Sequence, residues 1–307
     1  MLISFIFLMA SFAEAHQKLM NVGSLAHSCP VCGAASHHQT VVFHHALDFR
    51  DRHMHQCGMC TSVYVWPLPT DQELSGLYVG DKYYKSRGGR RAATQFPLLP
   101  SSQAQWIQQR ASGAWTERAR PVFVDVGCGA GFLLSKLWSL SPREGIQMIC
   151  YEPSKEVAED ARHTFKTHAA GSSYIVHPTL FDGCGHEQAG KITLITMSHV
   201  LEHLASPHSM LRTLAKCLMP RGYAFLAVPN KPLRGEASST LEQEVNTQGT
   251  RGVSSTGDFK PKNNFHLFYF TEKSIRALIY SGHNATFSII DTFSNSKEVR
   301  VLLRRRT

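Results

Sequence analysis

The feature that most constrains the fold is an alternation of strand-like and helix-like segments from residue 121 onward. Short apolar runs, such as residues 122–126 and 192–197, alternate with longer segments of helical periodicity, such as residues 155–168. Strands that alternate with helices predict a three-layer, Rossmann-like α/β sandwich with a mostly parallel sheet, here of seven strands. The last two strand segments have no helix between them, so we expect an antiparallel hairpin at one edge of the sheet.

The first of these strands ends in a glycine-rich turn. Asp125 closes the strand, and glycines follow at alternate positions: Gly127, Gly129 and Gly131. Glycine lets the backbone approach a ligand closely, and ligands of α/β sheets bind beyond the carboxyl ends of the strands. Glu152 ends the next strand, where an acid can accept hydrogen bonds from both hydroxyls of a ribose. Because Phe132 stands where a dinucleotide fingerprint has glycine, the pattern predicts a nucleoside site that need not hold a dinucleotide.

Four of the eight cysteines form two C-x-x-C pairs, CPVC and CGMC, that are separated by 24 residues. Each pair offers two thiolates from one tight turn, and two such turns close a tetrahedral metal site. We therefore predict a structural zinc in a small ribbon over residues 29–66, and we favour it over two disulfides or loose thiols. The expected ligands are Cys29, Cys32, Cys57 and Cys60.

Residues 1–28 form an apolar N-terminal extension whose first 15 residues resemble a short signal peptide. The stretch lacks the basic start of a signal peptide and is too short to span a bilayer as a helix. Thiolate zinc ligands also favour a reducing compartment. We expect a cytoplasmic protein without a stable membrane span; secretion or membrane association through this segment is the alternative.

The formal net charge of +9 suits an anionic partner but does not choose one. We favour a solvated basic surface and expect the arginines at 304–306 to form a frayed tail. Residues 67–120 are expected to form a connecting helical region, and the polar stretch 231–264 is expected to be an insertion at the rim of the site. The sequence does not set the oligomeric state.

Residues 121–304 resemble the class I S-adenosylmethionine-dependent methyltransferases. The resemblance lies in pieces that occur in family order: VDVGCGAG, YEPS, SHVLEHLASP, LMPRGYAFLAVPN and HLFYFTEKSIRALIYSGHN. The cysteine pairs and the YVWPLPTDQELSGLY stretch also resemble a zinc-ribbon module that precedes many such domains. Each motif is weak alone, whereas the ordered set is specific.

The resemblance implies a role for each matched position. Asp125 would orient the loop and the amino-acid portion of S-adenosylmethionine, the three loop glycines would pass under that portion, and Glu152 would bind the ribose. Asp182 is the acid nearest the position where the family often contacts the adenine amine.

Two histidines and one acid follow the fourth strand of the domain, in SHVLEHL. His199, Glu202 and His203, together with the distant His266, fall where the family faces its methyl acceptor. Some relatives that methylate small RNAs or quinone precursors hold a divalent ion with a similar set, but His199 replaces the first acid here. A bracing role without metal is favoured, and an imidazole general base is the intermediate reading.

Together these features predict an S-adenosylmethionine-dependent methyltransferase that methylates oxygen on a small-molecule or sugar-type acceptor. A non-catalytic methyltransferase fold that binds RNA or protein is the alternative from another class. Methylation of a nucleic acid or a nucleotide sugar is a further alternative, with nucleic acid not favoured. A dehydrogenase is disfavoured by Phe132.

Overall fold

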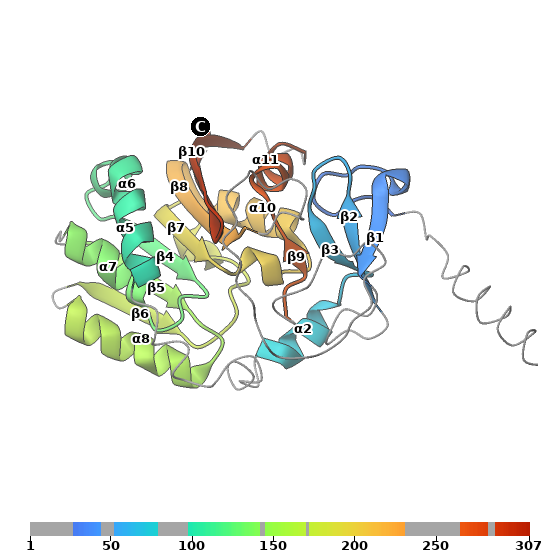
Figure 1. Cartoon of the computed structure of the whole chain (residues 1–307). Helices are drawn as coiled ribbons and strands as arrows, with labels where there is room; N and C mark the ends of the chain where they lie inside the picture. Colours follow the sequence, from blue (N-terminus) through green and yellow to red (C-terminus); the bar gives the residue numbers. More distant parts are fainter. Residues whose placement is uncertain are drawn as a thin grey trace, which may run out of the picture.

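A computed structural model describes residues 27–43, 52–78, 98–141, 145–169, 172–230, 265–281 and 286–307 (Figure 1). Its larger sheet has seven strands in the order β10–β11–β8–β7–β4–β5–β6. The strands in chain order are β4 (Val122–Val126), β5 (Gln147–Tyr151), β6 (Ser173–His177), β7 (Ile192–Ser198), β8 (Leu218–Pro229), β10 (Phe287–Ser294) and β11 (Glu298–Arg305). Strands β4 to β8 run parallel, and β11 pairs antiparallel with both β8 and β10. The expected seven-stranded sheet with an antiparallel edge hairpin is therefore confirmed.

Helices cover both faces of this sheet, which makes three layers (Figure 1). Strand alternation sends Phe123 of β4 to one apolar cluster and Val124 to the other. One face carries α5 (Leu98–Arg110), α6 (Gly113–Thr116), α7 (Phe132–Leu140) and α8 (Lys155–His168); the other carries α10 (Pro207–Cys217) and α11 (Glu272–Ser281). A single helix over 103–118 was expected, but Ser112 and Gly113, which favour helices weakly, divide it into α5 and α6.

Side-chain caps set the helix starts that the sequence predicted. Ser154 accepts a hydrogen bond from the backbone N–H of Val157 at the start of α8. Thr70 and Glu73 exchange hydrogen bonds in a capping box at the start of α2 (Asp71–Tyr78). Thr271 accepts from the N–H of Ser274 in α11. These local bonds satisfy backbone donors that have no partner within the helix.

The arginines at 304–306 do not form the frayed tail that we expected. Arg304 and Arg305 belong to β11, where they pair with Tyr223 of β8 and with the start of β10. The N–H of Arg306 still donates to the carbonyl of Thr286. The end of the chain is therefore part of the sheet, because β11 lies between two partner strands.

The cysteine-rich segment forms a second sheet in the order β1–β2–β3–β9. Strands β1 (Gln39–Phe43), β2 (His53–Cys57) and β3 (Val63–Trp66) come from the segment itself, with the short turn η1 (Ser36–His38) before them. The fourth strand, β9 (Phe268–Tyr269), comes from the C-terminal part of the chain and pairs with β3. The N–H of Val65 also donates to the carbonyl of Leu267.

The small sheet and the large domain share one apolar core. Val31, Tyr64 and Val65 lie in the same buried cluster as Leu278 of α11 and Leu214 of α10. The two parts therefore do not have separate cores, because β9 joins the large domain to the small sheet. The segments 1–26 and 231–264 lie outside the described residues, and the domain boundaries stay predictions. Among the residues that the structure describes, no helix is both long and apolar enough to cross a lipid bilayer.

Candidate active site

The glycine loop joins β4 to α7 at the carboxyl edge of the parallel strands. All three glycines have positive φ angles: 67° at Gly127, 54° at Gly129 and 78° at Gly131. At Gly129 a Cβ atom would meet no other atom within 4 Å, so the backbone there borders open space. The bare backbone at Gly129 therefore leaves room for a ligand to approach it.

The two flanking glycines are required by packing against the protein itself. A Cβ at Gly127 would lie 2.5 Å from a methyl carbon of Val200, and one at Gly131 would lie 3.0 Å from the ring of Phe165. Val200 directly follows His199, so the contact with Gly127 brings the glycine loop against the segment that carries the candidate acceptor-side residues.

Glu152 braces the glycine loop. Its carboxylate accepts the N–H of Gly129 at 3.1 Å and the N–H of Ser154 at 2.9 Å. The side chain is buried, with the residue 1% exposed. A carboxylate oxygen can accept more than one hydrogen bond, so this acid both shapes the loop and faces the space beside Gly129.

Asp125 lies in β4, two positions before Gly127. Its carboxylate accepts the hydroxyl of Thr196 in β7 at 2.7 Å and is 3% exposed as a residue. Burial raises the pKa of Asp125 to about 7, and the charge of Glu152 adds to the effect, while the bond from Thr196 opposes it. The carboxyl therefore titrates near neutral pH.

Strand β7 leads into a cluster of three imidazoles around one carboxylate. The 3-10 turn η2 (Leu201–His203) follows β7 and holds Glu202. Glu202 Oε1 lies 3.6 Å from Nδ1 of His199, 3.8 Å from Nε2 of His203 and 3.9 Å from Nε2 of His266. The structure thus brings together the four residues that the sequence singled out, although His266 lies more than 60 positions after His203 in the chain.

Neither carboxylate oxygen of Glu202 has a hydrogen-bond partner among the described residues, although the side chain is buried. His203 is fixed from its other side, because its Nδ1 lies 2.9 Å from the carbonyl of Phe265 and can only donate there. Nε2 of His203 therefore points toward Glu202. Glu202, His203 and His266 offer ligand atoms within 4.8 Å of one another, a spacing that a metal ion can bridge.

His199 lies between two carboxylates. Its backbone φ of 57° is unusual for a residue with a side chain, and its N–H donates to the carbonyl of Ala227 in β8. The second ring nitrogen, Nε2, lies 3.7 Å from Glu298. Burial lowers the pKa of His199, but contacts with Glu202 and Glu298 outweigh that effect and raise it to about 9. The same imidazoles outweigh the effect of burial on Glu202 and lower its pKa to about 2.

Sequence reasoning missed the residues that hold His199 from behind. Glu298, in β11, accepts a hydrogen bond from the side-chain amide of Gln103 at 2.9 Å and forms an ion pair with Arg300. The carbonyl oxygen of the Gln103 amide accepts the hydroxyl of Ser198 at 3.0 Å. Gln103 and Glu298 are separated by 195 positions, so no local motif signals them.

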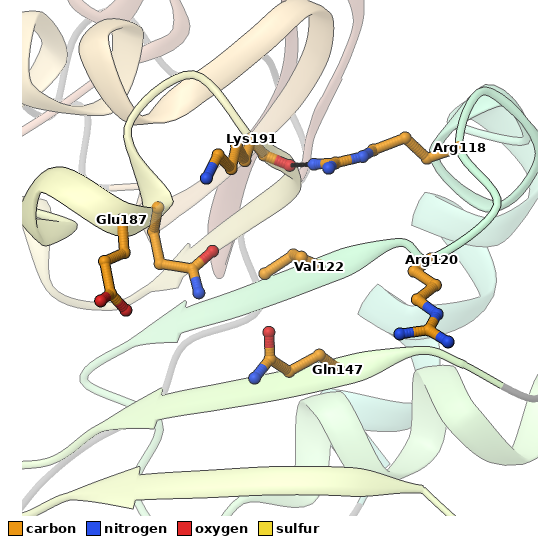
Figure 2. A pocket seen from close by; sticks show the side chains of 7 residues that line it. Arg118, Arg120, Val122, Gln147, Glu187 and Lys191 are labelled. Atoms are coloured by element: carbon orange, nitrogen blue, oxygen red, sulfur yellow. Dashed lines mark hydrogen bonds between the residues drawn. The ribbon is translucent and has the colours of Figure 1, made fainter.

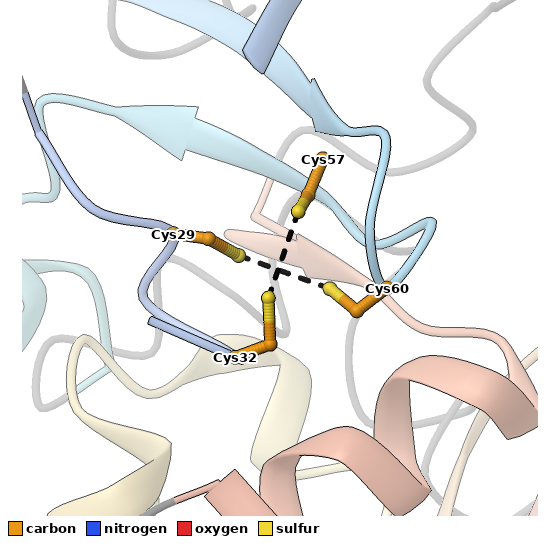
Figure 3. Close-up of side chains that lie close together, drawn as sticks. All are labelled: Cys29, Cys32, Cys57 and Cys60. Atoms are coloured by element: carbon orange, nitrogen blue, oxygen red, sulfur yellow. Dashed lines mark hydrogen bonds between the residues drawn. The ribbon is translucent and has the colours of Figure 1, made fainter. Parts of the chain in front are cut away.

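The four ribbon cysteines converge on one point (Figure 3). The sulfur of Cys29 lies 3.8 Å from that of Cys60, and the sulfur of Cys32 lies 3.6 Å from that of Cys57. In a tetrahedral zinc site with Zn–S bonds of about 2.3 Å, neighbouring sulfurs are about 3.8 Å apart. The hydrogen bond from Cys60 lowers the pKa of Cys29 to about 5 and raises that of Cys60. The donor set fits zinc in both chemistry and spacing.

The other four cysteines also pair. Cys128, in the glycine loop, is disulfide-bonded to Cys150 in β5, and Cys184 is bonded to Cys217 at the end of α10. The sequence did not suggest these pairs, because each joins residues without a characteristic spacing.

The fold and the glycine loop agree with comparison to known proteins. The sequence model of a family described as "Methyltransferase domain" matches residues 101–281, more than half of the chain. The chain belongs to this methyltransferase-domain family. The match covers the glycine loop, Glu152 and the whole histidine cluster.

Curated relatives of this methyltransferase are ubiquinone biosynthesis O-methyltransferases. The protein of Pectobacterium carotovorum is 30% identical over 183 residues, which are 57% of this chain and 72% of that protein. The protein of Vibrio campbellii is 26% identical over 130 residues, 42% of this chain and 51% of its own length. The chain therefore spans about half the length of several curated relatives that it matches.

A solved structure supports the fold of this methyltransferase. The Burkholderia thailandensis 1,6-didemethyltoxoflavin-N1-methyltransferase, with bound 1,6-didemethyltoxoflavin and S-adenosylhomocysteine, superposes with a TM-score of 0.53. The two chains are 13% identical, and the match covers 83% of this chain and 96% of the other. At that identity the likeness concerns the fold.

The residues of this methyltransferase fit the family's cofactor, S-adenosylmethionine. The decisive observation is the open space over Gly129 with a carboxylate, Glu152, anchored beside it. Asp182 is exposed in the loop after β6. Burial raises the pKa of Tyr151, and the charge of Asp182 raises it further, so this carboxylate lies near the Tyr151 ring. Tyr151 stacks on His177 at 4.7 Å and contacts Phe181 edge-on at 5.0 Å. These rings form an aromatic wall, which the sequence analysis missed, beyond Glu152.

Proposed function

We propose that the protein is an S-adenosylmethionine-dependent methyltransferase that methylates an oxygen of a small-molecule acceptor. One observation carries the proposal: the bare loop at Gly129 adjoins the histidine cluster, because Val200 packs on Gly127. A nucleoside site and a polar acceptor site therefore share one edge of the sheet. The O-methyltransferase names of the relatives support the choice of oxygen.

S-adenosylmethionine, when bound, supplies a methyl group activated by a sulfonium. The chain would fix the cofactor's position: Gly129 would leave room for the amino-acid portion, Glu152 would accept hydrogen bonds from the ribose hydroxyls, and Asp182 with the ring of Tyr151 would border the adenine. Asp125 acts indirectly through the end of β4. These roles rest on the placement of each side chain at the carboxyl edge.

The acceptor meets the cluster at His199, whose side chain is 33% exposed while that of Glu202 is 1% exposed. His199 carries a proton at neutral pH. We therefore assign it the role of hydrogen-bond donor to the methyl acceptor, not that of a base. Because Nδ1 of His203 donates to the carbonyl of Phe265, Nε2 is the unprotonated nitrogen of the neutral ring. His203 is therefore the candidate base that would take the proton of the acceptor hydroxyl.

The same cluster favours a second proposal, a divalent ion held by Glu202, His203 and His266. The two carboxylate oxygens without hydrogen bonds are the observation that supports it. A ligating histidine commonly donates its other N–H to a backbone carbonyl, as His203 does. Such an ion would polarise the acceptor hydroxyl.

We also infer one structural zinc bound by Cys29, Cys32, Cys57 and Cys60, on the strength of the sulfur spacing. Cytoplasmic location remains our proposal, because zinc-binding thiols favour a reducing compartment, although the disulfides Cys128–Cys150 and Cys184–Cys217 favour an oxidising one. Cell fractionation with an antibody to the native protein tests it, and recovery from the culture medium or the membrane fraction would contradict it.

Labelled methyl transfer tests the main proposal. The purified protein is incubated with trideuteromethyl S-adenosylmethionine and a metabolite extract, and products are analysed by mass spectrometry. We expect the label on an oxygen of a small molecule with wild-type protein and none with His203→Ala or Gly129→Val. Cofactor binding without any transfer would instead support a binding module, and label on nitrogen or carbon would contradict O-methylation.

The divalent ion is tested by metal content. We expect two metal ions per chain in wild-type protein supplied with Zn²⁺ or Mn²⁺, and only the ribbon zinc in Glu202→Gln. Glu156→Gln, at an exposed position on α8, serves as the control and should keep both ions. One ion in all three proteins would leave Glu202 a bracing residue and end this second proposal, whatever the activity.

A further inference from the structure

The topology gathers cationic side chains at the amino edge of the large sheet, opposite the glycine loop. Arg118 and Arg120 precede β4, and Lys191 precedes β7. Lys216 lies at the end of α10, where its carbonyl accepts the N–H of Gly190. Because β11 runs antiparallel to β8, it delivers the last arginines of the chain to this same edge.

The edge is hollowed rather than flat (Figure 2). A cavity of about 500 Å³ lies beside the first residues of β4 and β5. The guanidinium of Arg118 donates to the carbonyl of Lys191, which joins two sides of the hollow. Its lining combines cations with amides and one acid: Arg118, Arg120, Val122, Gln147, Gln188, Lys191 and Glu187.

The charges of this edge are poorly neutralised by the protein. Arg221 and Arg304 share Glu117 in ion pairs. In the described part of the chain, Arg120, Lys191 and Lys216 form no ion pair, and all three are exposed. Unpaired cations drawn from separate segments create a positive field that attracts a polyanion.

We propose that this amino edge binds the phosphate backbone of a nucleic acid strand. Cations and amide groups are the donors that phosphate oxygens accept from. Among the residues that the structure describes, the exposed large apolar side chains lie elsewhere, on the ribbon, β6, the loop after β6, α11 and β10, so the described part of the edge lacks the apolar groups that insert into a membrane. No exposed aromatic ring is among the described residues of the hollow, which predicts binding without base stacking and without sequence preference.

This surface is separate from the proposed methyl-transfer site. A five-residue strand such as β4 spans about 16 Å, so the hollow and the glycine loop lie at opposite ends of the same strands. The bound strand is therefore not the methyl acceptor, and its binding does not depend on the proposed function.

Fluorescence anisotropy of a labelled, mixed-sequence single-stranded RNA tests the proposal with the full chain. The edge variant combines Arg120→Gln, Lys191→Gln and Lys216→Gln. The control variant, Lys155→Gln, Lys166→Gln and Lys273→Gln, removes the same charge from exposed positions on α8 and α11. We expect the edge variant to bind about tenfold more weakly. Its plot of log affinity against log salt should be shallower by about 2, since each lost phosphate contact removes about 0.7.

The control variant should bind like wild type, and both variants should keep the wild-type melting temperature. Equal losses in the two variants would reduce the effect to net charge and overturn the proposal. Absence of RNA binding at low salt by wild type would overturn it too. Binding of wild type to vesicles rich in anionic lipid but not to RNA would assign the surface to a membrane and likewise contradict it.

Discussion

At the scale of single residues, Asp125 connects the cofactor loop to the stability of the sheet. Its carboxyl is buried beside Glu152 and has one hydroxyl partner, Thr196. The pKa of Asp125 in the folded protein, about 7, exceeds the ordinary value of 3.8 for an aspartic acid side chain. The folded state therefore holds the proton more tightly than the unfolded state does.

This difference predicts a pH-dependent stability. The contribution of Asp125 is fully present below about pH 4 and is lost as the pH rises through about 7. The shift of about 3 pKa units corresponds to a loss on the order of 4 kcal/mol. Asp125→Asn keeps the bond from Thr196 and cannot ionise, so its melting temperature relative to wild type should rise between pH 4 and pH 8.

Thermal melts of the cofactor-free protein at several pH values check this prediction. Asp182→Asn, which makes the same substitution at an exposed position, is the matched control for the change of side chain. A difference between Asp125→Asn and wild type that stays constant from pH 4 to pH 8 would contradict the raised pKa.

The sequence predicted the residues of the site that belong to short motifs. The glycines and Glu152 follow strands directly, and His199, Glu202 and His203 follow β7, so chain order alone places them at one edge. Glu298 and Gln103 could not be found in this way. They reach His199 from the edge strand β11 and from α5, and only the tertiary fold brings those segments together.

At the scale of elements, the pattern of apolar residues was sufficient to predict the strands of the large sheet but not those of the small sheet. The central strands β4 and β7 of the large sheet are buried on both faces and read as apolar runs. Strand β2, with sequence HMHQC, has no such pattern, and its pairing depends on the cysteine turns. Strand β9 has two residues, and its partner β3 lies more than 200 positions away, so tertiary contacts determine it.

The pairing of β3 with β9 changes what we expect from zinc removal. Cys57→Ser should expose residues 29–66 and also weaken β9 and α11, because they share one core. We expect the melting temperature to fall by about 10 °C or more, since a structural zinc contributes several kcal/mol. Met59→Ser, an exposed position in the same cysteine turn, is the control and should have little effect.

Hydrogen exchange measured by mass spectrometry distinguishes a core that the two sheets share from a separate core in the ribbon. Faster exchange in both residues 53–66 and residues 268–281 of Cys57→Ser fits a shared core. Faster exchange restricted to the ribbon strands would contradict it, and so would a metal analysis that finds no zinc in wild-type protein purified without chelator.

At the scale of the whole molecule, the two edges of one sheet carry different chemistry. The carboxyl edge combines bare backbone, buried carboxylates and imidazoles, whereas the amino edge carries unpaired cations around a hollow. Parallel strands impose this division, because all their carboxyl ends meet on one side. Sequence motifs located the carboxyl edge. They did not locate the cationic amino edge, because that edge depends on β11 running antiparallel to β8.

The measurement that tests the central claim most directly is calorimetric titration with S-adenosylhomocysteine. Gly129 and Gly190 both have positive φ angles, 54° and 70°, and open space where a Cβ would lie, but only Gly129 is in the proposed cofactor loop. The account predicts binding by wild type and by Gly190→Val with similar affinity, and no measurable binding by Gly129→Val. Unchanged affinity in Gly129→Val, or no binding by wild type, would contradict the assignment of this loop to the cofactor.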